Sequence, residues 1–176
     1  MRKGTWMVVA ALGLVMVPVA AEAQSGKVSL EGRGGIAIPR GELSRGGANS
    51  GFSAGLDLMY SMTPWFSGYV GGSRDEFDGG FSSSGLQLGG KIIAGGSDTT
   101  TPWFNLGLLG QKMTARGAES DRELGFEGGA GADFAISQQF SLTPAVRYRT
   151  YDAGFSSSSL SARYFVLSLG AHLHLR

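Results

Sequence analysis

The C-terminal stretch "RYFVLSLGAHLHLR" (Arg163–Arg176) alternates between apolar residues and residues that are mostly polar or small. Successive side chains of a β-strand point to opposite faces. One face would therefore carry Phe165, Leu167, Leu169, Ala171, Leu173 and Leu175, and the other face would carry Tyr164, Val166, Ser168, Gly170, His172 and His174. An alternation of this length predicts a long strand with one uniformly apolar face.

Seven earlier segments show similar alternation. They are Val28–Ile38, Gly51–Tyr60, Trp65–Ser73, Gly85–Ala94, Trp103–Met113, Leu124–Ile136 and Phe140–Tyr151. Glycine supplies 30 of the 176 residues and weakens helix interiors, whereas the regularly placed Leu, Ile, Val and aromatic residues argue against disorder. The sequence predicts an all-β chain of eight strands.

The N-terminal segment has the features of a secretory signal peptide. Arg2 and Lys3 precede an apolar run from Trp6 to about Ala20, and Ala21 and Ala23 flank Glu22 in an A-x-A pattern. The alternative is an uncleaved membrane anchor, but the run is shorter than the roughly 20 residues that a spanning helix needs. We expect cleavage after Ala23, which leaves one domain over residues 24–176.

Charge and cysteine content exclude several classes of protein. Removing Arg2, Lys3 and Glu22 from the 15 basic and 14 acidic residues leaves 13 of each, so nothing indicates a nucleic-acid partner. The chain has no cysteine and therefore no disulfide framework or thiolate metal site. Its stability must come from backbone pairing and packing.

The links between the predicted strands differ in a regular way. Short links, "SMTP", "GGSDTTTP" and "SQQF", follow the second, fourth and sixth strands, and polar links rich in glycine and serine follow the odd-numbered strands. Short turns at one end and longer loops at the other are typical of transmembrane β-barrels of the bacterial outer membrane. The predicted fold is an eight-stranded antiparallel up-and-down transmembrane β-barrel.

A repeated phrase marks one end of this barrel. Thr-Pro occurs at Thr63, Thr101 and Thr143, each time near the start of an odd-numbered strand, and Trp-Phe follows the first two copies. Proline is tolerated at the first residue of a strand, and aromatic rings gather at membrane interfaces. The expected interfacial aromatics at this rim are Tyr60, Trp65, Phe66, Trp103, Phe104 and Phe140, and those at the opposite rim are Phe77, Phe81, Tyr151 and Phe155. A simple repeat of a two-strand unit, without interfacial meaning, is the alternative.

If the apolar faces meet lipid, the charges within the strands must point into the barrel. The lumen is then expected to hold four acids and four bases, namely Glu31, Asp57, Glu127, Asp133, Arg33, Lys91, Arg147 and Arg149. A barrel of about eight strands is just wide enough for its own side chains to fill it. We therefore predict a lumen charge network that plugs the barrel, although solvated charges on a soluble sheet would give the same alternation.

Catalytic and metal sites are not predicted. His172 and His174 share a face, but a zinc site needs further ligands that no motif supplies. "GRGG" and "GGAGAD" lack the following helix of a phosphate loop, and "FSSSG" and "FSSSSL" contain no nucleophile elbow. We expect no cofactor, no metal and no enzymatic activity.

The signal peptide, the eight strands, the Thr-Pro turns with flanking aromatics and the terminal "YFVLSLGAHLHL" resemble the small outer-membrane β-barrel family, the OmpA-like and OmpX-like domains. The resemblance implies a monomer in the bacterial outer membrane, with outer-membrane lipid, lipopolysaccharide and the barrel-assembly machinery as partners. Members commonly end in an aromatic residue, whereas this chain ends in Leu175-Arg176.

The function expected from this resemblance is a structural or surface-interaction role through the outer loops of a plugged barrel. The alternatives are a narrow, OmpW-like channel for small or hydrophobic solutes, a lipid-modifying barrel enzyme, and a soluble lipocalin-like barrel that binds a ligand.

Overall fold

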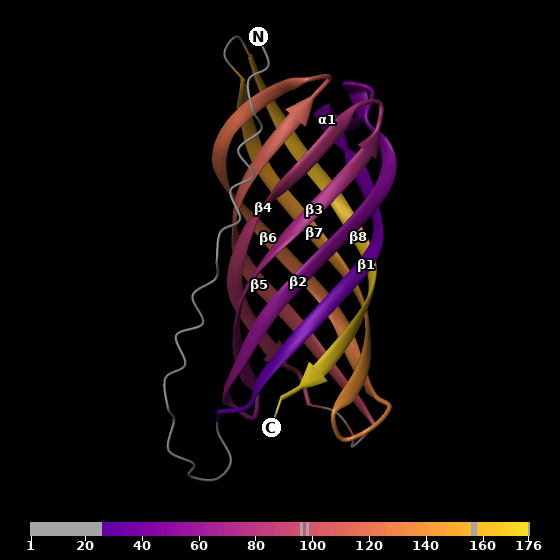
Figure 1. Ribbon diagram of the computed structural model, residues 1–176, viewed down its shortest axis with the longest axis vertical. Coiled ribbons are helices and arrows are strands. Elements are labelled where there is room, and N and C mark those ends of the chain that lie inside the picture. Colours follow the sequence, from indigo (N-terminus) through magenta and orange to yellow (C-terminus); the bar gives the residue numbers. More distant parts are fainter. Residues whose placement is uncertain (1–25, 96, 98, 156–157, 176) are drawn as a thin grey trace, which may run out of the picture.

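The computed structural model describes residues 26–95, 97, 99–155 and 158–175, and these form one closed antiparallel barrel (Figure 1). The predicted fold class is confirmed. The strands are β1 (Val28–Arg40), β2 (Asn49–Thr63), β3 (Phe66–Asp78), β4 (Phe81–Ile93), β5 (Thr100–Ala115), β6 (Ala118–Ala135), β7 (Phe140–Phe155) and β8 (Ser158–His174). A short helix, α1 (Gly41–Arg45), lies at the end of the barrel opposite the C-terminus.

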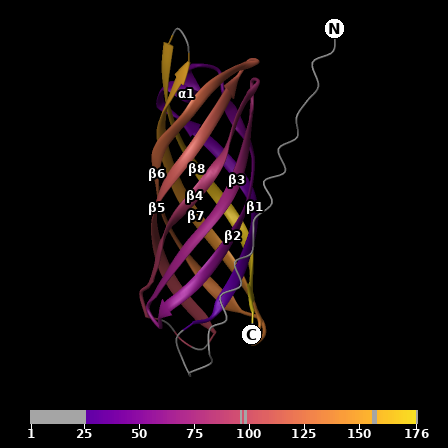
Figure 2. The ribbon, with the colours of Figure 1, turned by 60° about the vertical axis from the view of Figure 1, so that its left-hand side comes forward.

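Each strand pairs with its neighbours in sequence, and β1 pairs with β8 to close the wall. The register is followed by stepping between paired residues around the barrel, from Arg40 through Arg163, Thr150, Phe126, Leu108, Leu88, Val70 and Leu58 to Leu30. One circuit thus moves from residue 40 to residue 30 of β1, a shear of ten residues. Because shear requires tilt, the strands cross the barrel axis obliquely, as Figures 1 and 2 show.

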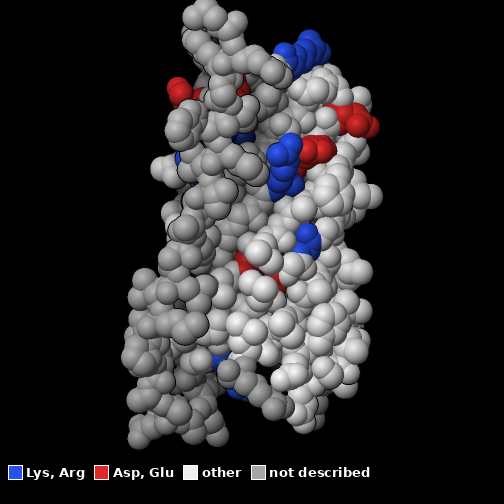
Figure 3. All heavy atoms as spheres, viewed as in Figure 1, with Lys and Arg blue, Asp and Glu red and all other residues white. Residues whose placement is uncertain are grey.

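The outer surface carries a wide apolar belt. Its exposed members come from all eight strands and include Ile36, Leu56, Val70, Leu88, Leu106, Phe126, Val146 and Leu169. Leu106 is 72 % exposed and Leu124 81 % exposed, values that are unfavourable for apolar side chains in water. In Figure 3 most charged side chains gather in the upper half, toward α1, and the lower right of the visible surface is nearly free of them. This distribution suits a bilayer around the lower part of the barrel.

The described residues of the polar links after β3, β5 and β7 are mostly strand, so the expectation of long outer loops was wrong there, and the link after β1 contains α1. β3 continues to Asp78 and joins β4 through Gly79 and Gly80 alone, and β5 joins β6 through Arg116 and Gly117. All four turn residues have positive φ, between 49° and 95°, as a two-residue hairpin of type I′ requires. The outer end is therefore built from extended hairpins that carry polar residues, together with α1.

The three Thr-Pro copies lie at the opposite end of the barrel from α1, but they occupy different structural positions. In the first copy, Pro64 and Trp65 form the turn between β2 and β3. The second copy lies within the first residues of β5, and the third lies inside β7, where the β6–β7 pairing skips Pro144 between Gly131–Ala145 and Phe134–Leu142. A proline has no N–H to contribute to that ladder.

No helix among the described residues is long and apolar enough to cross a membrane.

Candidate functional site

Apolar side chains close the interior at the outer end. Leu43 of α1 is fully buried and packs into a cluster with Phe77, Phe81, Met113, Tyr151 and Tyr164. The rings of Phe77 and Tyr164 meet edge to face, with centroids 5.1 Å apart. Such T-shaped contacts stabilise aromatic pairs beyond the effect of area alone. The helix thus closes the outer mouth with a side chain that has no contact with water.

Arg149 is the centre of the ion network that fills the middle of the barrel. Its guanidinium is fully buried and donates to Glu127 Oε2 at 2.7 Å and to Asp75 Oδ2 at 2.8 Å. The remaining donors reach Ser73 Oγ at 3.0 Å and Gln87 Oε1 at 2.9 Å. A buried charge is tolerated only when it is paired and hydrogen-bonded, and three other strands, β3, β4 and β6, provide the groups that pair with Arg149.

Further ion pairs extend the network toward the end of the barrel opposite α1. Arg33 pairs with Asp57, and Arg147 contacts Glu31 at 2.8 Å and Glu127 at 3.8 Å. Lys91 Nζ lies 2.8 Å from Asp133 Oδ2. Each pair joins different strands, so the network braces the wall from inside.

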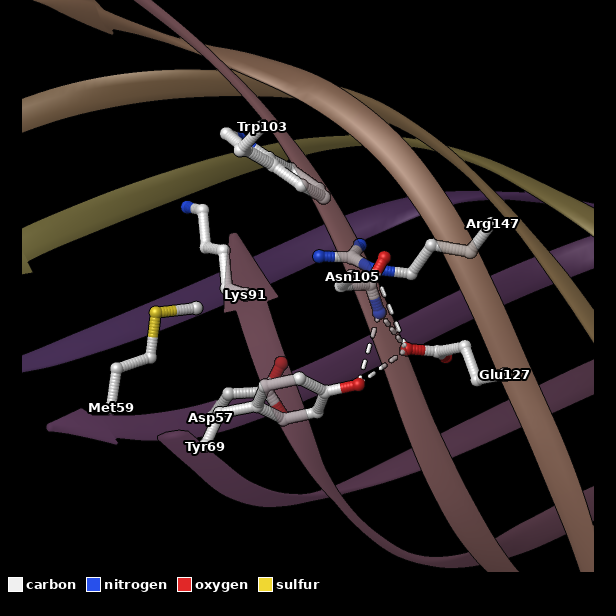
Figure 4. Close-up of a pocket in the computed structure, with 8 residues that line it drawn as sticks. All are labelled: Asp57, Met59, Tyr69, Lys91, Trp103, Asn105, Glu127 and Arg147. Atoms are coloured by element: carbon white, nitrogen blue, oxygen red, sulfur yellow. Dashed lines mark hydrogen bonds and ion pairs between the residues drawn. The ribbon is translucent and has the colours of Figure 1, made fainter. Parts of the chain in front are cut away.

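Figure 4 shows the point where the network meets the aromatic side chains of the lumen. Tyr69 and Asn105 donate to Glu127 Oε1 at 3.4 and 2.9 Å, and Asn105 also donates to the Tyr69 hydroxyl at 3.0 Å. The cavity that these residues line measures only about 10 Å³, which is about the space of one water molecule. The middle of the lumen is filled.

Glycines in the wall make room for the large interior side chains. A Cβ at Gly131 would lie 2.5 Å from Trp103 Cζ2, and one at Gly55 would lie 2.6 Å from the Arg33 guanidinium carbon. Real Cβ atoms do not approach other atoms so closely. Gly131 and Gly55 thus let Trp103 and Arg33 lie flat against the wall.

A chamber of about 230 Å³ opens at the end of the barrel opposite α1, lined by Lys91, Asp133, His172, His174 and several hydroxyl groups. His172 Nε2 lies 2.7 Å from Ser29 Oγ, a Ser-His contact that the sequence did not reveal because 143 positions separate the two residues. The other ring nitrogen is 4.0 Å from Asp133, whose carboxylate already accepts from Lys91, Trp103 and Thr143. That separation is too long for the hydrogen bond that orients a catalytic histidine. Within the described residues, no group of three or more metal-binding side chains occurs.

All eight charged residues expected in the lumen lie inside the barrel. Seven are buried, and Asp133 is half-buried at the edge of the chamber. Sequence reasoning missed Asp75, which is fully buried, because the third strand was expected to end at Ser73. It also missed the interior hydroxyls of Tyr69 and Tyr164, which bond to Glu127 and Asp75.

The expected interfacial aromatics divide into two groups. Tyr60, Trp65 and Phe104 are exposed on the outer surface, and Phe66 and Phe140 are half-buried. Trp103 was placed wrongly: it is 1 % exposed, donates to Asp133 at 3.1 Å and lies over Lys91. Since adjacent strand residues face opposite ways, Trp103 must point inward when Phe104 points outward.

At the opposite rim, Phe77, Phe81 and Tyr151 were also placed wrongly. They are buried within the outer apolar cluster, and Phe155 packs against it.

A closed barrel with an apolar exterior and an interior of paired charges defines a transmembrane β-barrel, and excludes the soluble lipocalin-like alternative, in which the apolar face would be turned inward. The family model for the outer membrane protein β-barrel domain matches residues 7–172. The chain belongs to this family, as the resemblance implied, and the family places it in the bacterial outer membrane. The predicted signal peptide and its cleavage after Ala23 lie outside the described residues.

Several solved structures share the fold. The crystal structure of Neisserial surface protein A is 14 % identical and has a TM-score of 0.71, with 84 % of this chain and 97 % of that chain covered. OprG from Pseudomonas aeruginosa is 14 % identical with a TM-score of 0.59, covering 86 % and 98 %. The N-terminal barrel of OprF from the same organism is 12 % identical with a TM-score of 0.56, covering 85 % and 99 %. No curated protein matches the sequence.

Proposed function

We propose that this protein is a plugged, non-conducting barrel with a structural and surface-interaction role in the outer membrane. The observation that carries the proposal is the continuous filling of the lumen from Leu43 at the outer mouth to the ion pairs of Arg149 and Arg147 in the middle. An ion that crossed the barrel would have to displace both layers. Fold alone does not assign this role.

We assign the surface-interaction role to the outer end of the barrel. It presents α1 and the polar ends of the β3–β4 and β5–β6 hairpins rather than long loops. Outer-membrane lipid, lipopolysaccharide and, during insertion, the barrel-assembly machinery are the partners we propose for a monomer, and the role includes no catalytic step.

A narrow channel is the second candidate, favoured by the 230 Å³ chamber at the periplasmic end. Solute could enter there as far as Lys91. The ion pairs of Arg147 and Arg149 and the apolar cluster around Leu43 would have to move before it could pass through the barrel.

Planar-bilayer recording separates the two candidates. A plugged barrel gives no discrete ion steps, with insertion verified by co-flotation with vesicles and by heat-modifiable migration on gels. Discrete steps from the wild-type protein that persist in Lys91→Gln and Arg147→Gln variants would contradict the plugged barrel and favour the channel.

A further inference from the structure

Two arginines face each other on the outside of the barrel at the upper edge of the apolar belt. Arg40, the last residue of β1, pairs directly with Arg163 of β8 across the seam that closes the wall. Both side chains are exposed. Like charges in directly opposite positions on neighbouring strands destabilise a sheet.

These arginines also lack the counterions that Arg74 and Lys112 of the outer wall have. Arg74 pairs with Glu76 at 2.7 Å, and Lys112 pairs with Glu119 at 2.5 Å. Over the described part of the chain, no carboxylate lies within 4.0 Å of the guanidinium nitrogens of Arg40 or Arg163. Arg40 and Arg163 therefore place two positive charges side by side with no carboxylate of the described residues to neutralise them.

Two acids near the arginine pair, Glu42 and Asp152, form no ion pair with it. Glu42 of α1 accepts the backbone N–H of Ser161 at 3.1 Å. Asp152 of β7 is exposed and pairs with the same Ser161, one outward position beyond Arg163. Both acids stand on the α1 side of the arginine pair, away from the belt.

An aromatic surface lies on the belt side of the pair. Tyr148 and Phe165 are directly opposite each other on β7 and β8, with ring centroids 5.1 Å apart. The guanidinium carbon of Arg40 is 5.9 Å from the centroid of the Phe165 ring, within range of a cation–π contact. Thr150 continues the row beside Arg163 on β7 and faces outward like Tyr148.

We propose that Arg40 and Arg163 bind a phosphate group of lipopolysaccharide, with the acyl chains of the lipid resting on Tyr148 and Phe165. This site deepens the proposed lipid partnership and rests on the outer-membrane placement of α1 at the outer end. Planar guanidinium groups match phosphate oxygens through parallel charge-assisted hydrogen bonds. A phosphate between the two arginines removes their mutual repulsion. The apolar rings of Tyr148 and Phe165, on the belt side of the arginines, provide a surface for the acyl chains.

The test uses the full chain in phosphatidylcholine nanodiscs to which rough-type lipopolysaccharide is added, with bound lipid counted by native mass spectrometry. Replacing both arginines by Gln is expected to weaken binding about tenfold or more, because two charged hydrogen-bonding groups are lost. Arg45→Gln is the control for the loss of one positive charge and matches the single variants R40Q and R163Q: Arg45 is exposed on α1, away from the belt, and its loss should change binding by no more than about twofold.

Several outcomes would overturn the proposal. An R40Q/R163Q protein that binds as tightly as wild type would do so, as would an equal loss in R45Q, which would indicate a general effect of net charge. Wild-type protein that binds inorganic phosphate as tightly as lipopolysaccharide would mean that the pair is a site for free anions. If the double variant fails to show heat-modifiable migration, the single variants R40Q and R163Q are each expected to lose part of the affinity, and unchanged binding in both would also overturn the site. Ion steps in planar bilayers would contradict the plugged barrel without altering this binding measurement.

Discussion

Arg149 and Asp75 form a buried ion pair in the middle of the barrel, 2.8 Å apart in space and 74 positions apart in sequence. Asp75 holds the pair in place by accepting two further hydrogen bonds, from the Tyr164 hydroxyl at 2.7 Å and from Ser53 Oγ at 2.5 Å. One carboxylate thus connects β2, β3, β7 and β8 through the lumen.

Replacing Asp75 by Ala should destabilise the barrel strongly, because Arg149 would remain in the interior with only Glu127 as a counterion. Breaking a buried pair from one side costs about 3 to 5 kcal/mol. Reversible urea unfolding in lipid vesicles measures this difference. Glu76→Ala is the matched control on the next residue: its carboxylate is exposed beside Arg74, and surface pairs contribute only about 0 to 1 kcal/mol. Equal losses at both positions would contradict a stabilising network in the lumen.

Leu106→Arg tests the lipid-facing belt. Leu106 is 72 % exposed on the outer face of β5, and an arginine facing lipid near the bilayer midplane costs about 2 to 4 kcal/mol. Thr114→Arg, on the same strand near the outer end, should cost only about 0 to 1 kcal/mol, as is found near the interfaces. Unfolding in vesicles gives both values. If the two substitutions are equally costly, the bilayer does not surround the belt at this depth.

The two tryptophans of the repeated phrase should respond differently to quenchers in the lipid. Trp65 is 60 % exposed at the membrane edge, whereas Trp103 is 1 % exposed and faces Lys91 in the lumen. In vesicles of brominated lipid, Trp65→Phe should abolish most of the quenching of tryptophan fluorescence, and Trp103→Phe should abolish little. A large effect of Trp103→Phe would place its ring outside the barrel.

Gly131→Ala tests whether the wall and lumen are packed without spare room. The new Cβ would lie 2.5 Å from Trp103 Cζ2 and 2.6 Å from the Pro144 carbonyl oxygen, and overpacking of this kind costs about 1 to 3 kcal/mol. Gly34→Ala is the control, because its Cβ would only reach ordinary contact with Phe52 at 4.0 Å. Unfolding midpoints that drop equally in both variants would mean that the loss comes from the glycine backbone and not from contact with Trp103.

The alternation in Arg163–Arg176 and its weaker copies was enough to predict the strand count, the outward faces and the eight charges of the lumen. It could not predict where the strands end. Beyond the lipid belt the outward residues become polar, as at Arg74 and Glu76, so the apolar signal stops while the backbone pairing continues. The sequence-based prediction missed Asp75 for that reason.

Trp103 shows a second limit of sequence reasoning. Identical letters, Thr-Pro-Trp-Phe, form a turn at residues 63–66 and lie within a strand at residues 101–104. The face of a side chain depends on the register, and register is set by pairing with distant strands. For the same reason, the partners within the ion network cannot be predicted from a single sequence. Arg147 and Glu31, for example, are 116 positions apart.

The charges of the lumen have a consequence for how the barrel closes. The pairing of β1 with β8 closes the wall, and it brings Glu31 within reach of Arg147. A slip of one residue at this seam would turn every side chain of β1 to the other face, so that Glu31 and Arg33 would point into lipid and Arg147 would lose its nearest acid. The interior ion pairs therefore favour the correct register over a one-residue slip, because the slip would break them and place charges in lipid.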